Sequence, residues 1–255
     1  MSEARPWRRA IVWLLVLGPF FFASYGFATW VTAQRSDVGF IVFAWERQIP
    51  LLPWTIVPYW LVDLLYGLSL LLCATRRQLD THAARLLVTQ LLAVSAFLVF
   101  PLRCTFPRGD VQGSFGWMLD LMSFDQPYNQ APSLHIALLV VLLEPYLRAV
   151  PRAWHTLVYA AALLIGVSVL TTWQHHFVDI PTGFWLGCFA VWLFPTDAPP
   201  PLRRATLTGS RKRRRLAAGY AAGSLGIGLL APGAGGAWRW LLGAAGGLAL
   251  VALRY

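Results

Sequence analysis

The sequence has few charged residues and few cysteines for its length. Charged residues make up 13% of the 255 positions, whereas an ordinary soluble domain has about 25%. Hydrophobic residues make up 57% and the mean hydropathy is +0.56, which excludes a disordered chain and argues against a water-soluble globule. The three cysteines, Cys73, Cys104 and Cys188, are too few and too scattered for a disulfide framework or a structural zinc site. The composition indicates an integral membrane protein.

Long apolar runs predict an all-α protein that crosses the membrane about eight times. A helix needs roughly 17–25 apolar residues to span a bilayer. The first run is too long for a signal peptide, so we interpret it as an uncleaved anchor. The predicted spans lie near residues 10–32, 56–75, 84–102, 133–149, 154–172, 180–195, 216–232 and 238–253.

Basic residues predict the orientation of these spans. With both termini in the cytoplasm, sixteen of the twenty-one Lys and Arg residues lie inside, as expected for inner loops. The run Arg211–Arg215 is then better explained by anionic lipid than by nucleic acid. His82 and His155 fall in short inner loops, where we expect solvated or interfacial roles. A single lysine beside twenty arginines is typical of a GC-rich bacterial genome, which suggests an inner membrane.

Differences in amino-acid composition divide the chain into three parts. Residues 1–195 form the predicted six-helix core, and residues 196–215 form a basic, Pro-rich cytoplasmic linker. Residues 216–255 contain Ala-Gly runs, and small residues allow close helix packing. We therefore predict that this tail is a transmembrane hairpin. The sequence leaves the oligomeric state open.

Ionisable side chains gather at the predicted outer ends of the spans. They are His135, His175 and Asp179, with Arg103 and Arg108 in the long outer loop. Such groups are costly in a membrane and are usually functional. His175 and Asp179 are spaced i,i+4, so a helix would place them on one face. The carboxylate would fix one imidazole nitrogen and leave the other free as a nucleophile or base.

A helix start and the arginines add features suited to phosphate. Pro132 and Ser133 are typical of a helix N-terminus, where free N–H groups and the helix dipole favour an anion. An arginine offers a planar fork to phosphate oxygens. Three alternatives use the same residues: a His/His/Asp metal site, three structural histidines, and a hydrolase with Ser133 as nucleophile. We expect neither a metal nor a cofactor.

These residues resemble the type 2 phosphatidic acid phosphatase superfamily. The resemblance is greatest to its branch with inositol phosphorylceramide synthase and sphingomyelin synthase, and it covers about residues 55–195. It implies a six-helix catalytic core. The motifs that carry it are Pro107-Arg108, Pro132-Ser133-Leu134-His135 and His175-His176-Phe177-Val178-Asp179.

The resemblance implies a role for each residue. His175 attacks phosphorus and forms a phosphohistidine, and Asp179 orients it. His135 protonates the leaving oxygen and then activates the accepting water or alcohol. Arg108 and Ser133 hold the phosphoryl oxygens. The implied partners are membrane lipids and a phosphorylated lipid substrate, bound at the outer leaflet with the site facing the periplasm.

Two cationic positions of the superfamily pattern are missing here. They are occupied by Pro101 and Val169, and Arg103 is the candidate to compensate. Three hypotheses therefore stand. The first is a lipid phosphatase that cleaves a phosphate or pyrophosphate. The others are a lipid phosphotransferase that moves a phosphorylated head group to a lipid or sugar hydroxyl, and a non-catalytic lipid-binding protein.

Other polar or aromatic features have simpler interpretations. Asp63 either binds an active-site arginine or anchors a neighbouring helix. Glu144 is predicted to be structural, and His176 is not assigned to catalysis. Residues 114–124 predict a helix on the outer membrane surface, with a lid as the alternative. Residues 40–60, rich in aromatics and Pro, predict an interfacial belt, with a lipid gate as the alternative.

Overall fold

The computed structural model describes residues 4–107, 111–122 and 126–197, together with a few positions between 215 and 223. This part of the chain is helical, and its β pairing is limited to one bridge between Gly39 and Leu102. The α-helices are α1 (Trp7–Ala33), α2 (Ile56–Leu72), α3 (Arg76–Val99), α4 (Ser114–Leu121), α5 (Leu134–Ala149), α6 (His155–Thr171) and α7 (Asp179–Leu193). The 3-10 helices are η1 (Ala44–Gln48), η2 (Pro53–Thr55) and η4 (Arg152–Trp154).

Several of these helices have the length and composition of membrane spans. Four segments are long and apolar enough to cross a bilayer: Trp7–Ala33, Pro53–Leu72, Arg76–Val99 and Arg152–Thr171. Large apolar side chains also point outward, and Leu15, Phe22, Leu163 and Trp185 are each 68–72% exposed, which a lipid environment explains. These features indicate an all-α integral membrane protein.

The predicted count of eight spans is not confirmed. Helices occupy the first six predicted spans, but α5 has 16 residues and α7 has 15. The predicted linker lies mostly outside the described residues, and so does the C-terminal hairpin. The chain divides into two compact units, Met1–Val191 and Trp192–Tyr255. All features discussed below belong to the first unit.

Helix α3 begins eight residues before its predicted span. Its start is capped by Thr75, whose Oγ1 accepts from Gln78 N at 3.2 Å, and Gln78 Oε1 accepts in turn from Ala74 N at 2.9 Å. This reciprocal cap satisfies backbone donors at the start of the helix. The expectation that His82 is solvated in a loop is therefore wrong. His82 is 3% exposed, and its Nε2 lies 2.7 Å from Ser69 Oγ.

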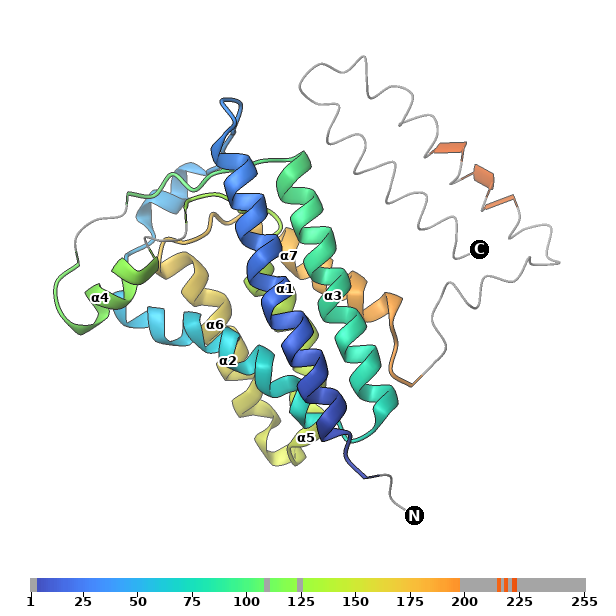
Figure 1. The fold of residues 1–255 in the computed structure, drawn as a ribbon. Helices are drawn as coiled ribbons and strands as arrows, with labels where there is room; N and C mark the ends of the chain where they lie inside the picture. Colours follow the sequence, from blue (N-terminus) through green and yellow to red (C-terminus); the bar gives the residue numbers. More distant parts are fainter. Residues whose placement is uncertain are drawn as a thin grey trace. The chain divides into compact units, whose positions relative to one another are not determined.

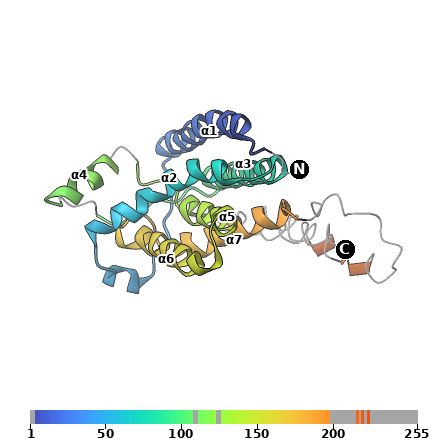
Figure 2. The same cartoon turned by 90° about the horizontal axis from the view of Figure 1, so that it is seen from below.

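The helices of the first unit pack around α5. It contacts α2, α3 and α6, and α1 packs on α2 and α3. Figure 2 shows this order, with α1 and α6 on opposite sides of α5. The main core cluster includes Leu86, Phe97, Leu138 and Leu142, each at most 2% exposed. Helix α5 thus has a fixed position between its neighbours.

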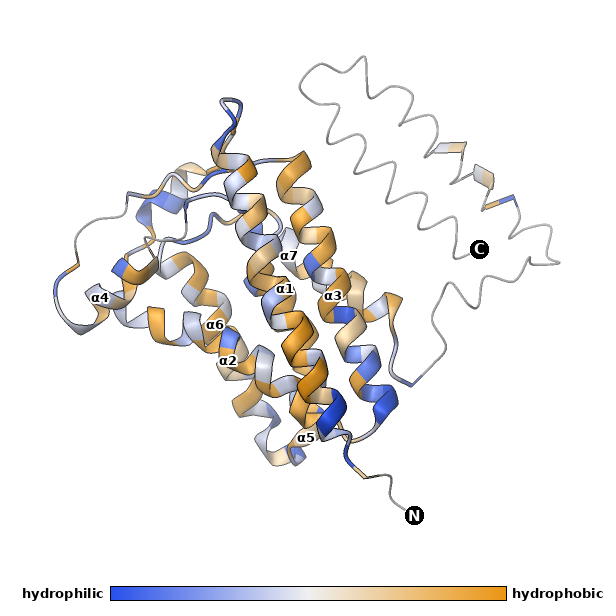
Figure 3. Ribbon diagram, in the orientation of Figure 1, coloured by the Kyte–Doolittle hydropathy of each residue, from blue (hydrophilic) through white to orange (hydrophobic). Residues whose placement is uncertain are grey.

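The two ends of this bundle differ in charge. The N-terminal ends of α1 and α3 are hydrophilic (Figure 3) and lie together with the junction of α5 and α6 (Figure 1). We call this the basic end; it carries Arg8, Arg9, Arg76, Arg77 and Arg148. The chain alternates direction, so the C-terminal ends of α1, α3 and α6 and the N-terminal ends of α2, α5 and α7 meet at the opposite end. We call that the histidine end.

Ion pairs stabilise the basic end. Arg9 Nε lies 2.6 Å from Asp80, and Arg148 Nε lies 2.9 Å from Glu144. Glu144 also accepts from Arg85, whose side chain is 2% exposed on α3. A buried arginine requires such a partner. Glu144 therefore has the structural contacts expected from the sequence.

Candidate active site

His175 and Asp179 form a buried pair between α6 and α7. The chain leaves α6 through Trp173, which has a φ of 56°, and His175 N donates to Val169 O at 3.1 Å. His175 Nδ1 lies 3.1 Å from Asp179 Oδ2, and the residues are 5% and 0% exposed. The i,i+4 contact was expected on a helix, but a turn makes it, because α7 begins only at Asp179. The carboxylate nevertheless fixes the imidazole as predicted.

Ser133 faces the other nitrogen of His175. Its Oγ lies 3.4 Å from His175 Nε2. Ser133 is the N-cap residue of α5, and its Oγ accepts from Ile136 N at 3.4 Å. Its own N–H donates to Asp179 O at 3.0 Å. The starts of α5 and α7 are therefore held together beside the His175 ring.

His135 completes the cluster on the second residue of α5. Its ring stacks on Tyr59 of α2, with centroids 4.1 Å apart, and its centroid is 6.1 Å from that of His175. The Nε2 atom of His135 is buried and has no hydrogen-bond partner among the described residues. The structure thus brings together His135, His175, Asp179 and Ser133, although up to 46 positions separate them in the sequence.

Of the two predicted arginines, the structure describes Arg103. Arg108 lies outside the described residues. Arg103 is exposed, and its guanidinium lies 5.8 Å from the centroid of the Phe40 ring. Its backbone N–H donates to Gly39 O at 2.9 Å. In the part of the chain that the structure covers, neither histidine of the cluster contacts an arginine.

Glu46 is a site residue that the sequence analysis missed. It lies on η1 and is 0% exposed. Its Oε2 is 3.0 Å from His176 Nδ1 and accepts from Phe177 N at 2.9 Å, while Oε1 accepts from Phe43 N at 2.7 Å. Glu46 is the sole acid between positions 38 and 62. A carboxylate in an apolar, aromatic segment needs a buried partner, and this signal was available in the sequence.

The Glu46 contact fixes the proton on His176. Thr105 N donates to His176 Nε2 at 3.0 Å, so Nε2 is the acceptor and Nδ1 carries the hydrogen that Glu46 binds. His176 N also donates to Asp179 Oδ2 at 3.0 Å. His176 therefore holds the turn that carries His175 in place.

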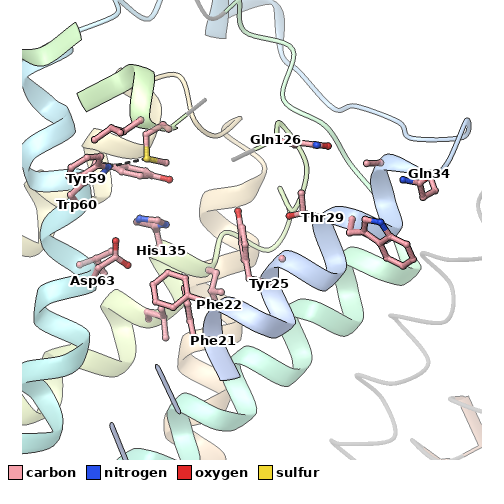
Figure 4. A pocket seen from close by; sticks show the side chains of 18 residues that line it. Phe21, Phe22, Tyr25, Thr29, Gln34, Tyr59, Trp60, Asp63, Gln126 and His135 are labelled. Atoms are coloured by element: carbon pink, nitrogen blue, oxygen red, sulfur yellow. Dashed lines mark hydrogen bonds between the residues drawn. The ribbon is translucent and has the colours of Figure 1, made fainter. Parts of the chain in front are cut away.

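A cavity of about 610 Å³ adjoins His135. Its walls come from α1, α2, α4, α5 and the segment after α4, and they are mostly aliphatic and aromatic. Figure 4 shows the side chains that line it, with His135 and Asp63 on the wall. His175 is not among the lining residues. Of the four cluster residues, His135 is the one that lines the cavity.

The surroundings of the cavity match part of the sequence analysis. Helix α4 forms within the predicted segment 114–124 and packs on η2 and α2. Trp60 Nε1 donates to Met122 Sδ at 3.0 Å next to it. In the aromatic segment 40–60, Phe43 and Trp45 are exposed and contact Phe177. Aromatic side chains thus surround the site at the histidine end.

Neither of the two contacts expected of Asp63 is seen among the described residues. It lies on α2, and its side chain is exposed and lines the cavity. Within the described segments it forms no hydrogen bond or ion pair with an arginine or with a neighbouring helix.

Sequence comparisons do not identify a family for this chain. No protein-family model matches the chain, and no curated protein matches it.

Proposed function

We propose that this chain is a membrane lipid phosphatase of the type 2 phosphatidic acid phosphatase kind. It cleaves a lipid phosphate or pyrophosphate at the outer leaflet through a phosphohistidine on His175. One observation carries the proposal: His175 is held by Asp179 on one side, and its other nitrogen faces Ser133 and the His135 ring.

In the first step, His175 Nε2 attacks phosphorus. A P–N bond forms, the P–O bond to the lipid breaks, and His135 in its protonated form gives its proton to the leaving oxygen. Asp179 Oδ2 accepts the Nδ1 hydrogen and stabilises the ring as it gains positive charge. An attacking atom starts about 3–3.5 Å from its target, and ring centroids 6.1 Å apart allow both rings to serve one phosphorus.

In the second step, water replaces His175 on phosphorus. His135 is now neutral and removes a proton from the water, whose oxygen forms a P–O bond while the P–N bond breaks. Phosphate and the free enzyme result. Phosphoryl transfer depends on positioning and electrostatics, so two fixed imidazoles are the main requirement.

The start of α5 is suited to hold the phosphoryl oxygens. Ser133 caps this helix, and a helix N-terminus offers free N–H groups and a partial positive charge to an anion. The resemblance assigns a further cation, Arg108, to the same oxygens. Both contributions favour charge that develops on the phosphoryl group in the transition state.

The surroundings support a lipid substrate. The cavity beside His135 has mostly apolar walls and a volume of about 610 Å³, which suits a hydrophobic chain. The histidine end is opposite the basic end, and basic ends normally face the cytoplasm. This polarity supports a site at the outer leaflet of a bacterial inner membrane.

Replacement of His175 tests the phosphatase directly. His175→Ala should lower the turnover of every lipid phosphate substrate by about a thousandfold or more, because it removes the nucleophile. Phosphate release is measured on phosphatidate, phosphatidylglycerol phosphate, polyprenyl pyrophosphate and ceramide-based lipids, with and without EDTA. His155→Ala is the matched control, since His155 contacts Leu147 O at the far end of α5. Turnover retained by His175→Ala would contradict the assignment.

A lipid phosphotransferase is the second candidate, favoured by the apolar cavity beside His135. In that reaction an alcohol from the cavity replaces water in the second step. Free phosphate as product supports the phosphatase, whereas a new phosphorylated lipid that appears only with an added alcohol supports transfer. If no acid-labile phosphohistidine can be trapped with any of these substrates, both proposed reactions are contradicted. A non-catalytic lipid-binding protein is then the remaining hypothesis.

A further inference from the structure

Asp63 contributes a carboxyl group to the mostly apolar cavity that adjoins His135. No residue among those described bonds to its carboxyl group, although it lies on a helix that has the composition of a membrane span. A carboxyl group in apolar surroundings is costly without a hydrogen-bond partner. The Nε2 atom of His135 also has no partner among the described residues. His135 and Asp63 therefore both border this cavity, and neither the Asp63 carboxyl group nor His135 Nε2 has a hydrogen-bond partner among the described residues.

The spacing of these groups follows from α2. Tyr59 stacks on His135, and Asp63 is four residues further along the same helix, so its side chain lies on the face of Tyr59. Four residues advance about 6 Å along a helix. Because α2 runs from the histidine end toward the basic end, Asp63 is one turn deeper than the Tyr59–His135 stack. Figure 4 shows both His135 and Asp63 directed into the cavity.

We propose that Asp63 is a specificity site for the alcohol portion of the lipid substrate. It accepts a hydrogen bond from a donor group that lies a few bonds from the oxygen esterified to phosphorus. The inference rests on the proposed function for the position of the phosphoryl group, but the binding of the donor group can be measured separately.

A hydroxyl on the neighbouring carbon fits the spacing. The hydroxyl oxygen is roughly 3 Å from the ester oxygen, and a hydrogen bond to a carboxyl oxygen adds about 2.8 Å. Together these distances match the advance of about 6 Å from Tyr59 to Asp63 along α2. With phosphorus at His175 and the ester oxygen at His135, this hydroxyl reaches Asp63 while the hydrocarbon chain occupies the apolar walls. A lipid without such a donor would leave the carboxyl group unsatisfied.

Two lipids that differ in one group test the site through turnover. Lysophosphatidate has a free 2-hydroxyl, and its 2-O-methyl ether lacks the donor. The wild type should prefer the hydroxyl form by about tenfold or more in kcat/KM, the loss expected for a missing hydrogen bond to a charged or buried acceptor. Asp63→Leu should reduce this preference to within twofold. Asp37→Leu is the control, because Asp37 is exposed outside the cavity and pairs with Arg35.

A binding measurement separates this site from the chemistry. The full-length His175→Ala variant, in nanodiscs, should bind lysophosphatidate about tenfold more tightly than its methyl ether. Trp60 and Trp30 line the cavity, so tryptophan fluorescence reports binding. The added Asp63→Leu change should abolish the difference; if that variant fails to fold, Asp63→Asn, which removes the carboxylate at constant size, should still reduce it.

The outcomes distinguish the two proposals. Equal affinity of His175→Ala for the two lipids, or a difference that survives replacement of Asp63, would overturn the specificity site. A difference that depends on Asp63, in a protein that hydrolyses no lipid phosphate, would support the site and reject the phosphatase.

Discussion

Asp179 is fully buried in the candidate site, and one of its oxygens contacts two N–H groups. Its Oδ2 accepts from His176 N and lies within hydrogen-bond distance of His175 Nδ1. Its Oδ1 is buried without a hydrogen-bond partner among the described residues. A carboxylate suits this position because both oxygens accept and neither donates. An amide could keep its oxygen at the Oδ2 position, but it would lack the negative charge that stabilises the imidazole ring as it gains positive charge.

Asp179→Asn should therefore lower kcat by about 10³–10⁴-fold, the scale of the loss when asparagine replaces the aspartate of a Ser-His-Asp triad. Lipid phosphate turnover at saturating substrate measures the effect. Asp120→Asn, on the exposed side of α4, is the control and should retain activity. An Asp179→Asn variant with normal kcat would show that the His175–Asp179 contact has no role in catalysis.

Glu46 affects His175 through the neighbouring residue. It receives hydrogen bonds from both His176 and Phe177 at one oxygen. Glu46→Gln should lower kcat by about tenfold to a hundredfold, because a charge-assisted bond to a buried group is lost, and KM should change little. Steady-state kinetics and a melting curve in detergent are measured together. A rise in KM alone would argue against a positioning role.

The sequence predicted some of these residues and missed others for a physical reason. His135, His175, Asp179 and Ser133 could be grouped because each falls at the same end of a predicted span. Glu46 contacts His176 across 130 positions, and such a contact leaves no local periodicity. The position of Arg103 depends on a side-chain conformation, which places it over Phe40 and which no sequence pattern encodes.

Helices α5 and α7 pack closely at two glycines of α7. This contact between helices positions Asp179 next to Ser133. A Cβ atom at Gly183 would collide with Ser133 O, and one at Gly187 would lie 2.6 Å from Ala137 O. The two glycines are spaced i,i+4, so one face of α7 lies against the backbone of α5. Small residues at this spacing allow close packing of membrane helices. The same face begins at Asp179.

Gly183→Ala should push α7 away from α5 and separate Asp179 from Ser133. We expect a loss of about 1–3 kcal/mol in stability, typical of overpacking, and a fall in activity. Thermal unfolding in detergent and turnover are the measurements. Gly18→Ala is the matched control, since a Cβ at Gly18 meets no atom within 4 Å. Equal effects of the two substitutions would contradict the role of the α5–α7 contact.

Helix existence was easier to predict than helix bounds. Apolar runs located the six core helices, because lipid requires long uninterrupted apolar segments. The start of α3 was placed too late because its first turns carry charges that resemble a loop. Arg85 is buried in the bundle and pairs with Glu144, so its charge marks a contact between helices. The Thr75–Gln78 cap was the available signal for the true start.

The charge difference between the two ends predicts how the whole molecule sits in a membrane. In a cysteine-free background, Ser36→Cys at the histidine end should react with a membrane-impermeant thiol reagent in intact cells. Ala74→Cys at the basic end should react only after permeabilisation, since inner ends carry the excess of arginine. Ser36 and Ala74 are both exposed, so access rather than burial decides the result. The reverse pattern would place the site in the cytoplasm.

The Nδ1 contact of His175 with Asp179 determines which regioisomer of phosphohistidine can form. With Nδ1 occupied, only Nε2 is available to accept a phosphoryl group. The two regioisomers of phosphohistidine are distinguished by isomer-specific antibodies and by ³¹P chemical shift. A trapped adduct of this protein should therefore be 3-phosphohistidine, and the 1-isomer would require the bond to Asp179 to break before reaction.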